Sequence, residues 1–280
     1  MIAVSDGGVS RNPLDGAKLD ELVAVPDSIW RRVEVVASTG STNADLIARA
    51  RKGEDVSGTV LVAENQTAGR GRNGRTWSAV PGAQLLMSVG IPSADLPVGA
   101  WGWVSLATGL AVVAAVADVA GVPSGLKWPN DVLAGDDGRK LAGILAEVAT
   151  PAPVIVVGVG LNVSLRADEV PHPAATSLTM LGADDQDRTE LIGALLRELQ
   201  DRIQRLKAAG GADDALVAEY VASSLTISAR VRATLPGDRE VVGTALSIDD
   251  HGRLRIDTGN EVVVVSAGDV VHLRPVEGPG

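Results

Sequence analysis

Thr59-Val-Leu-Val-Ala63 and Gln84-Leu-Leu-Met-Ser-Val89 are two apolar runs, and between them the chain includes Glu64-Asn-Gln-Thr-Ala-Gly-Arg-Gly-Arg-Asn-Gly-Arg-Thr-Trp77. Both runs are short and aliphatic, which predicts two buried strands. Residues 64–77 carry three arginines and three glycines, and we expect a long loop without regular structure, as in lids and binding loops. Glycine lets a backbone fold closely around a ligand, and the arginine fork matches carboxylate and phosphate oxygens. This arginine loop (residues 64–77) therefore predicts the capture of an anion.

Strands and helices alternate on both sides of the loop. Sequence patterns predict further strands at 32–37, 126–128, 141–148 and 154–163, and helices at 44–52, 98–120, 188–208 and 213–222. Beyond residue 224 the chain changes to short alternating segments with turn residues between them, which is typical of a small SH3-like barrel. Its strands are expected at 229–235, 240–248, 253–257, 261–266 and 270–274.

These patterns divide the chain into three parts. We expect an N-terminal extension at 1–30, a main domain at 31–223 and a C-terminal domain at 224–280. The extension carries one short predicted helix near 17–23, which is too little for a DNA-binding module.

Composition excludes several classes of protein. The 280 residues are 45% hydrophobic, enough for one large core or for a core with a small satellite. The net charge of -10 argues against a nucleic-acid partner, so the arginine loop favours a small anionic ligand. With no cysteine, the chain has no disulfide, thiol nucleophile or cysteine zinc site. The start lacks a signal-peptide pattern and the longest apolar runs, such as Val154–Val163, are short, so we expect a cytoplasmic protein without membrane segments.

Two common catalytic patterns are incomplete. Gly69 to Thr76 is one residue away from a Walker A motif, but Arg75 stands where lysine is required and Pro81-Gly82 prevents an immediate helix. The histidines are far apart in the sequence, and neither metal-ligand spacing nor a Ser/His/Asp set is evident, so the metal ligands stay unknown. Hydrolase and zinc-enzyme functions therefore have little support.

A second polar motif, Lys127-Trp-Pro-Asn-Asp131, follows a predicted strand. Pro129 fixes a turn that presents Asn130 and Asp131 at the strand end, a common place for ligand-binding groups. Lys140 stands where a polar loop enters a buried strand, so its ammonium group could reach the rim of a pocket. The alternative is an ordinary hairpin with common turn residues.

Two further motifs are weaker by themselves. Gly158-Val-Gly160-Leu-Asn162 lacks the third glycine and the helix of a Rossmann fingerprint, and it fits either a plain core strand or one against which a ligand lies. Gly40-Ser-Thr-Asn43 fits a helix cap, whose free N–H groups and hydroxyls also suit a carboxylate, amide or ureido ligand.

Taken in order, these motifs resemble those of the bacterial biotin protein ligases. The matching segments are Gly40-Ser-Thr-Asn43, Gln66-Thr-Ala-Gly-Arg-Gly-Arg72 with Trp77, Lys127-Trp-Pro-Asn-Asp131, Lys140-Leu-Ala-Gly143 and Gly158-Val-Gly-Leu-Asn162. The resemblance implies an α+β fold: a mixed sheet flanked by helices, like that of class II aminoacyl-tRNA synthetases, followed by an SH3-like domain. It also implies a ligase that joins biotin to ATP, with Mg²⁺, and then transfers biotin to one lysine of a biotin carboxyl carrier domain. Because no DNA-binding domain is predicted, a repressor role is not expected.

The resemblance also implies roles for individual residues. Lys140 is expected at the reacting carboxylate, with Arg72 and Asp131 as further catalytic residues. The residues expected to bind biotin are Ser41, Thr42, Asn43, Gln66, Arg70, Gly71, Arg72, Lys140 and Gly143. Those expected to bind ATP or the adenylate are Arg70, Arg72, Arg75, Trp77, Lys127, Asn130 and Asn162.

Physical reasoning supports this assignment. A carboxylate that attacks the α-phosphorus of ATP meets a second anion, and fixed cations offset the repulsion. The resulting anhydride is prone to hydrolysis, so a loop that excludes water has a clear use. Two alternatives stay open: a lipoate or other acyl ligase, and a non-catalytic sensor of biotin or its adenylate.

Overall fold

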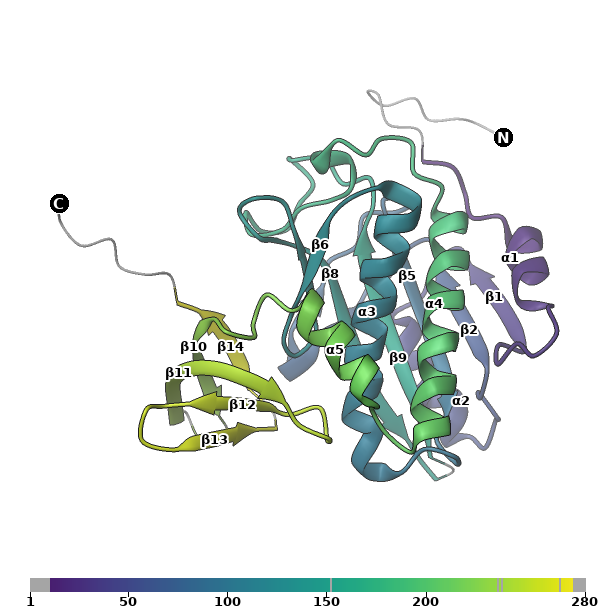
Figure 1. The fold of residues 1–280 in the computed structure, drawn as a ribbon. Coiled ribbons are helices and arrows are strands. Elements are labelled where there is room, and N and C mark those ends of the chain that lie inside the picture. Colours follow the sequence, from purple (N-terminus) through teal and green to yellow (C-terminus); the bar gives the residue numbers. More distant parts are fainter. Residues whose placement is uncertain (1–10, 152, 236, 238, 267, 274–280) are drawn as a thin grey trace.

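The computed structural model describes residues 11–273, except 152, 236, 238 and 267. Within these residues a sheet of seven strands forms the centre of the main domain, in the order β1-β2-β5-β9-β8-β7-β6. The sheet is mixed, because β1 and β2 are parallel and the remaining neighbours are antiparallel (Figure 1). Its strands are β1 (Arg32–Val36), β2 (Thr59–Ala63), β5 (Gln84–Pro92), β6 (Ser124–Lys127), β7 (Asp131–Ala134), β8 (Arg139–Ala149) and β9 (Val154–Asn162).

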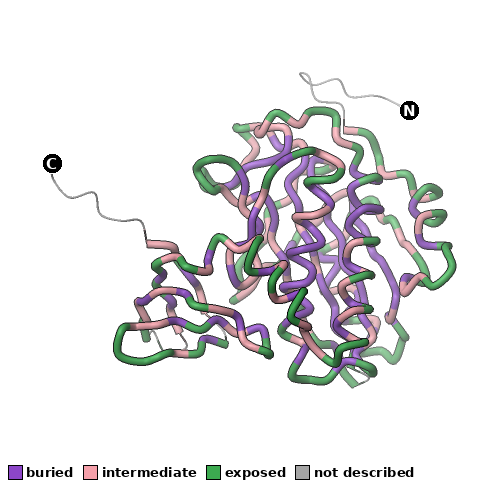
Figure 2. The backbone as a smooth tube through the Cα atoms, viewed as in Figure 1, coloured by how far each residue is buried: buried purple, intermediate pink, exposed green. Residues whose placement is uncertain are grey.

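Helices cover both faces of the sheet. One face packs against α3 (Trp101–Ala120), α4 (Arg188–Ala209) and α5 (Asp214–Ser223). The other face packs against α2 (Thr42–Arg51), whose Leu46 and Ile47 belong to a second, smaller apolar cluster. The central strands are buried from both sides, as Figure 2 shows. The helices expected from periodicity are therefore confirmed, and α1 (Gly16–Val23) packs beside β1 and α4.

Helix α3 corrects one expectation about apolar length. Together with η2 (Val98–Ala100) it forms a stretch, Val98–Ala120, that is long and apolar enough to cross a membrane by length and composition. Most of this stretch is buried inside the protein, as expected for a core helix. It packs against α4 and the sheet, and Gly121 ends it with a φ of 64°.

The arginine loop contains regular structure, so the expectation of an irregular segment is wrong. Strands β3 (Gly69–Arg70) and β4 (Thr76–Trp77) pair as a small antiparallel hairpin around the 3₁₀ turn η1 (Arg72–Gly74). Asn73 and Gly74 have φ values of 55° and 72°, a region that these two residue types tolerate. The local sequence therefore closes a tight turn and holds the arginines on a defined backbone.

The second polar motif is also part of a hairpin. Strands β6 and β7 pair antiparallel, and residues 128–130 connect them at the edge of the main sheet. The short strand β7 was not expected from the sequence. The sequence left open an ordinary hairpin or a ligand-binding motif. The hairpin is present, and its polar side chains also line a cavity.

The C-terminal domain is an antiparallel sheet with the strand order β13-β12-β11-β10-β14. All five predicted strands are confirmed, although the expected end at Arg274 lies outside the described residues. They are β10 (Arg230–Leu235), β11 (Arg239–Ile248), β12 (Leu254–Asp257), β13 (Val262–Val265) and β14 (Asp269–His272).

The turn between β11 and β12 fastens this sheet to the main domain. Trp103 Nε1 donates to the Asp249 carbonyl at 3.0 Å, and Trp128 Nε1 donates to the Gly252 carbonyl at 3.1 Å. A side chain at Gly102 would place its Cβ 2.1 Å from the carbonyl oxygen of His251, so glycine permits this close approach. β14 and the β6–β7 hairpin line the same cavity.

Candidate active site

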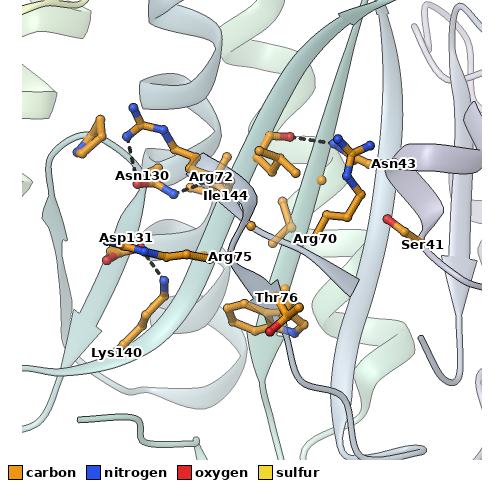
Figure 3. A pocket seen from close by; sticks show the side chains of 18 of the residues that line it. Ser41, Asn43, Arg70, Arg72, Arg75, Thr76, Asn130, Asp131, Lys140 and Ile144 are labelled. Carbon is orange, nitrogen blue, oxygen red and sulfur yellow. Dashed lines mark hydrogen bonds and ion pairs between the residues drawn. The ribbon is translucent and has the colours of Figure 1, made fainter. Parts of the chain in front are cut away.

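A cavity of about 220 Å³ opens on the sheet where the arginine loop, the β6–β7 hairpin and β14 meet. Figure 3 shows arginine side chains of the loop facing Asn130, Asp131 and Lys140 across it. Fourteen of the residues expected at the site from the sequence line this cavity: Ser41, Thr42, Asn43, Gln66, Arg70, Gly71, Arg72, Arg75, Trp77, Lys127, Asn130, Asp131, Lys140 and Gly143.

One end of the cavity is a buried chain of hydroxyl and amide groups. Ser41 caps α2 by accepting from the Ala44 N–H, which places Thr42 and Asn43 in the first turn, facing the sheet. Gln66 Oε1 accepts from the Thr42 N–H at 2.8 Å, and the Thr42 and Ser88 hydroxyls lie 2.6 Å apart. The Ser88 hydroxyl donates to Asn43 Oδ1 at 2.6 Å. This end is therefore preorganised for a polar, uncharged ligand group.

Glu147 connects this polar end to the arginine loop, and the sequence analysis missed it. Its carboxylate accepts from Asn43 Nδ2 at 3.0 Å and from an Arg70 nitrogen at 2.9 Å. Asn43 Nδ2 also donates to the Leu145 carbonyl, so both hydrogens of its amide nitrogen are used. An acidic residue within the apolar strand β8 was the signal that could have pointed to this role.

The opposite end of the cavity is cationic. Lys140 Nζ lies 2.6 Å from Asp131 Oδ1 and 5.6 Å from the centre of the Trp77 ring. A nitrogen of Arg72 donates to Asn130 Oδ1 at 3.3 Å, and burial lowers the pKa of its guanidinium, a shift that the Asp269 and Asp131 carboxylates oppose. Arginine does not lose its proton in proteins, so this half-buried cation is available to a ligand with negative charge.

Glycines on β8 and β9 make room for neighbouring side chains. A Cβ at Gly160 would lie 2.4 Å from Trp77 Cε2, and one at Gly143 would lie 2.9 Å from the same ring. At Gly158 the added Cβ would lie 2.4 Å from Asn43 Oδ1. All three glycines also line the cavity, so the expectation that a ligand lies against them stays a prediction. Trp77 forms the floor of the cavity, and its buried Nε1 has no partner among the described residues.

The C-terminal domain completes the cavity, which the sequence analysis did not foresee. Asp269, Val270 and Val271 of β14 line its outer wall, and Asp269 forms an ion pair with Arg75 at 2.5 Å. The sequence holds no motif for this wall, because it depends on how two separately predicted domains dock.

Asn162 is the predicted site residue that does not reach this cavity. It lines a neighbouring cavity of about 630 Å³ that also contains His172 and shares Trp77 and Lys140 with the first. Its side chain accepts from Gln84 Nε2 at 2.9 Å and donates to the Thr176 carbonyl at 2.8 Å. No cluster of three or more metal-ligating side chains occurs within the described part of the chain.

Comparison with known proteins identifies the family. Residues 35–163 match the biotin/lipoate A/B protein ligase family, and residues 227–273 match the biotin protein ligase C-terminal domain. A biotin–[acetyl-CoA-carboxylase] ligase of Mycobacterium tuberculosis is 56% identical, over 94% of this chain and 97% of the relative. The bifunctional ligase/repressor BirA of Escherichia coli is 32% identical, over 88% of this chain and 75% of its own length.

A solved structure shows the same architecture. The biotin protein ligase of Aquifex aeolicus, in complex with biotin and ATP, matches with a TM-score of 0.74 and 25% identity, over 87% of this chain and 100% of that chain. The similarity therefore extends through both domains. The chain belongs to the family of biotin protein ligases.

Proposed function

We propose that this protein joins biotin to ATP, giving biotinyl-5′-AMP and pyrophosphate, and then transfers biotin to one lysine of a biotin carboxyl carrier domain. The convergence of arginine-loop cations and Lys140 on one cavity carries this proposal. The Mycobacterium tuberculosis relative bears the name of this activity, and the Aquifex aeolicus structure contains both small substrates.

The polarity of the cavity suggests how biotin lies in it. The polar ureido head fits the end formed by Ser41, Thr42, Asn43 and Gln66, where donors and acceptors are already ordered. The hydrocarbon body would lie along Trp77, and the carboxylate would reach the cationic end. This orientation gives the head-binding roles to α2 and the reacting end to the two hairpins.

The first chemical step unites two anions. A carboxylate oxygen of biotin forms a bond to the α-phosphorus of ATP, and the bond from that phosphorus to the β,γ-pyrophosphate breaks. Lys140 and Arg72 would offset the charge that builds up, and Asp131, 2.6 Å from Lys140 Nζ, would orient the ammonium group. Arg70 and Gly71 would close over biotin as parts of the same loop.

The nucleotide would occupy the outer part of the site. Lys127, Asn130, Arg75 and Trp77 line the cavity beside Lys140, and Asn162 lines the adjoining one, which has room for the rest of the nucleotide. Mg²⁺ would enter bound to the phosphates, because it is usually held by substrate phosphates and few carboxylates. Bound there, it would neutralise phosphate charge.

The second step moves the biotinyl group to the carrier. The neutral ε-amine of the carrier lysine attacks the acyl carbon of the anhydride, AMP leaves with the electron pair of the broken C–O bond, and the amine releases a proton to solvent. The arginine loop would exclude water until the carrier arrives. A biotin carboxyl carrier domain is thus the proposed partner, and the cytoplasm the proposed location.

We also propose the finer assignments of fold. The mixed sheet with helices on both faces supports a class II aminoacyl-tRNA synthetase-like main domain at 31–223. The five short antiparallel strands support an SH3-like domain at 224–280, preceded in the chain by an extension at 1–30.

Mass spectrometry tests the function directly. The protein is incubated with a biotin carrier domain, biotin and MgATP, and a biotinyl adduct is expected on a single lysine of the carrier. A carrier whose target lysine is replaced by arginine is the matched control. Absence of the adduct from the parent carrier would reject the proposal.

Two variations of the experiment separate the alternatives. Lipoate in place of biotin should give no adduct, whereas a lipoate ligase would modify the carrier. Release of pyrophosphate with biotin and MgATP, without carrier, would reject a non-catalytic sensor. If the sensor assignment were right, biotin would bind and no pyrophosphate would form.

A further inference from the structure

Arg188 is a buried arginine at the first position of α4, outside both cavities that contain Lys140. Its side chain is 5% exposed, and Nη1 lies 2.7 Å from Glu64 Oε2. Nη1 also donates to the Gln84 carbonyl at 3.3 Å, and Nη2 donates to the Asn12 carbonyl at 2.6 Å. A fully buried charge is rare, and it needs partners of this kind to be tolerated.

Two of the three partners of Arg188 are the two stems of the segment that carries the arginine loop. Glu64 directly follows β2, and Gln84 is the first residue of β5, so one guanidinium group joins both ends. The Gly82 N–H also donates to the Glu64 carbonyl at 3.0 Å. The loop therefore starts and ends at points that are fixed to each other and to α4.

The returning limb of the loop is fixed through the side chain of Gln84. Its Oε1 accepts from the Val80 N–H at 3.0 Å, and its Nε2 donates to the Ser78 carbonyl at 3.1 Å. Ser78 directly follows Trp77, which forms the cavity floor beneath Lys140. A shift of Gln84 would thus move Ser78 and, with it, Trp77 at the reacting end of the site.

The N-terminal segment completes this arrangement. The Leu14 N–H donates to Glu64 Oε1 at 2.7 Å, so both carboxylate oxygens of Glu64 are used. The Asp15 N–H donates to Thr189 Oγ1 at 3.1 Å, beside Arg188 on the first turn of α4. Residues 12–15 therefore hold the base of the loop, although they are far from the loop in the sequence.

We propose that Arg188 is a positioning residue of the ligase reaction, which fixes both stems of the arginine loop so that its arginines return to one geometry over bound biotin. The proposal rests on the proposed function for its kinetic consequence. Its structural consequence, a loop held at the base without any ligand, can be measured independently. The residue touches neither substrate in the proposed arrangement and acts through Glu64 and Gln84.

Trypsin provides the ligand-free measurement, because it cleaves after arginine and the loop contains three. Arg188→Ala should raise the rate of cleavage after Arg70, Arg72 and Arg75, located by mass spectrometry, by about tenfold or more. Arg202→Ala is the matched control: Arg202 is 11% exposed, lies on the same helix and pairs with Glu198 and Glu219, far from the loop. Its loop cleavage should match that of the parent protein.

Two milder variants keep the test decisive if Arg188→Ala does not fold. Arg188→Lys retains the charge but not the fork, and Glu64→Gln removes the charged partner, so both should give intermediate cleavage rates. In steady-state assays the variants should raise the KM for biotin and the leakage of free biotinyl-5′-AMP more than they lower kcat. Arg202→Ala should leave the KM for biotin, the leakage of biotinyl-5′-AMP and kcat unchanged.

The outcomes separate the two proposals. Equal loop cleavage in the Arg188, Glu64 and Arg202 variants at matched thermal stability would overturn the positioning role. If even the parent protein forms no biotinyl adduct, the proposed function fails, and the ligand-free cleavage rates still decide whether Arg188 fixes the base of the loop.

Discussion

Replacement of Lys140 by methionine should separate catalysis from stability. The substitution removes the ammonium group and keeps an unbranched apolar stem beside Trp77 and Gly143. The ion pair with Asp131 is short, but the lysine side chain is 36% exposed, so solvent screening limits the contribution of the pair. Such a pair contributes at most about 1 kcal/mol, and the cation–π contact at the Trp77 ring adds about 0.5 kcal/mol.

The expected loss of stability is therefore small. A change of about 1 kcal/mol lowers the melting temperature of a domain of this size by roughly 2–4 °C. The effect on adenylation should be much larger, because removal of one preorganised group that faces the developing charge costs about 3–4 kcal/mol, or 100- to 1,000-fold in rate.

Stopped-flow measurement of pyrophosphate release with biotin and MgATP gives the adenylation rate, and calorimetry gives the melting temperature. Lys207→Met is the control, since Lys207 lies on α4, away from the cavity, is more buried than Lys140 and pairs with Asp95. An adenylation rate within about threefold of the parent would refute the assignment of Lys140 to the reacting carboxylate.

Three further predictions concern the surroundings of the cavity. Glu147→Gln should weaken biotin binding about tenfold in calorimetric titration, because a charge-assisted bond to the arginine loop is lost; unchanged affinity would exclude the connection between loop and polar end. Gly160→Ala should disturb the indole ring 2.4 Å from the new Cβ and destabilise the protein by about 1–3 kcal/mol in urea unfolding, whereas Gly16→Ala, with its nearest contact at 3.7 Å, should not. Burial, and secondarily Lys127, lowers the pKa of His272 from 6.5, so the unfolded chain binds a proton more readily and stability should fall as pH drops below about 6.5. His272→Gln should lose this dependence in thermal unfolding at pH 7.5 and 5.5, and an unchanged pH profile would contradict the assignment.

Strands and helices could be predicted wherever a local pattern of apolar residues determines which side chains are buried. Residues 60–63 and 154–157 are continuous aliphatic runs within strands that are covered on both faces of the sheet, so the position of these strands follows from composition. Helix α4 presents leucines at helical spacing to the core, and its cap residues mark both ends. Short strands such as β7 and β3 escaped prediction, because two to four residues carry too little periodicity and their pairing depends on the partner strand.

The site was predictable where function imposes a local motif. The residues of the arginine loop and of the β6–β7 hairpin are consecutive in the sequence, so their chemistry is visible before folding. Glu147, Ser88 and Asp269 became apparent only in three dimensions, because each acts on a group that is distant along the chain. Asn162 shows the reverse: its motif indicated the site, but its amide is already bound to neighbours in an adjoining cavity.

The wall contributed by β14 has a consequence for biosynthesis. The groups that surround the cavity run from Ser41 to Val271, so the ribosome must add nearly all of these residues before the chamber can be sealed. Since domains generally fold in the order in which they are translated, the nascent main domain would hold its recognition groups while one side stays open to water. The cavity is therefore complete only after the second domain has folded. A prematurely terminated polypeptide would lack the wall that retains a reactive intermediate.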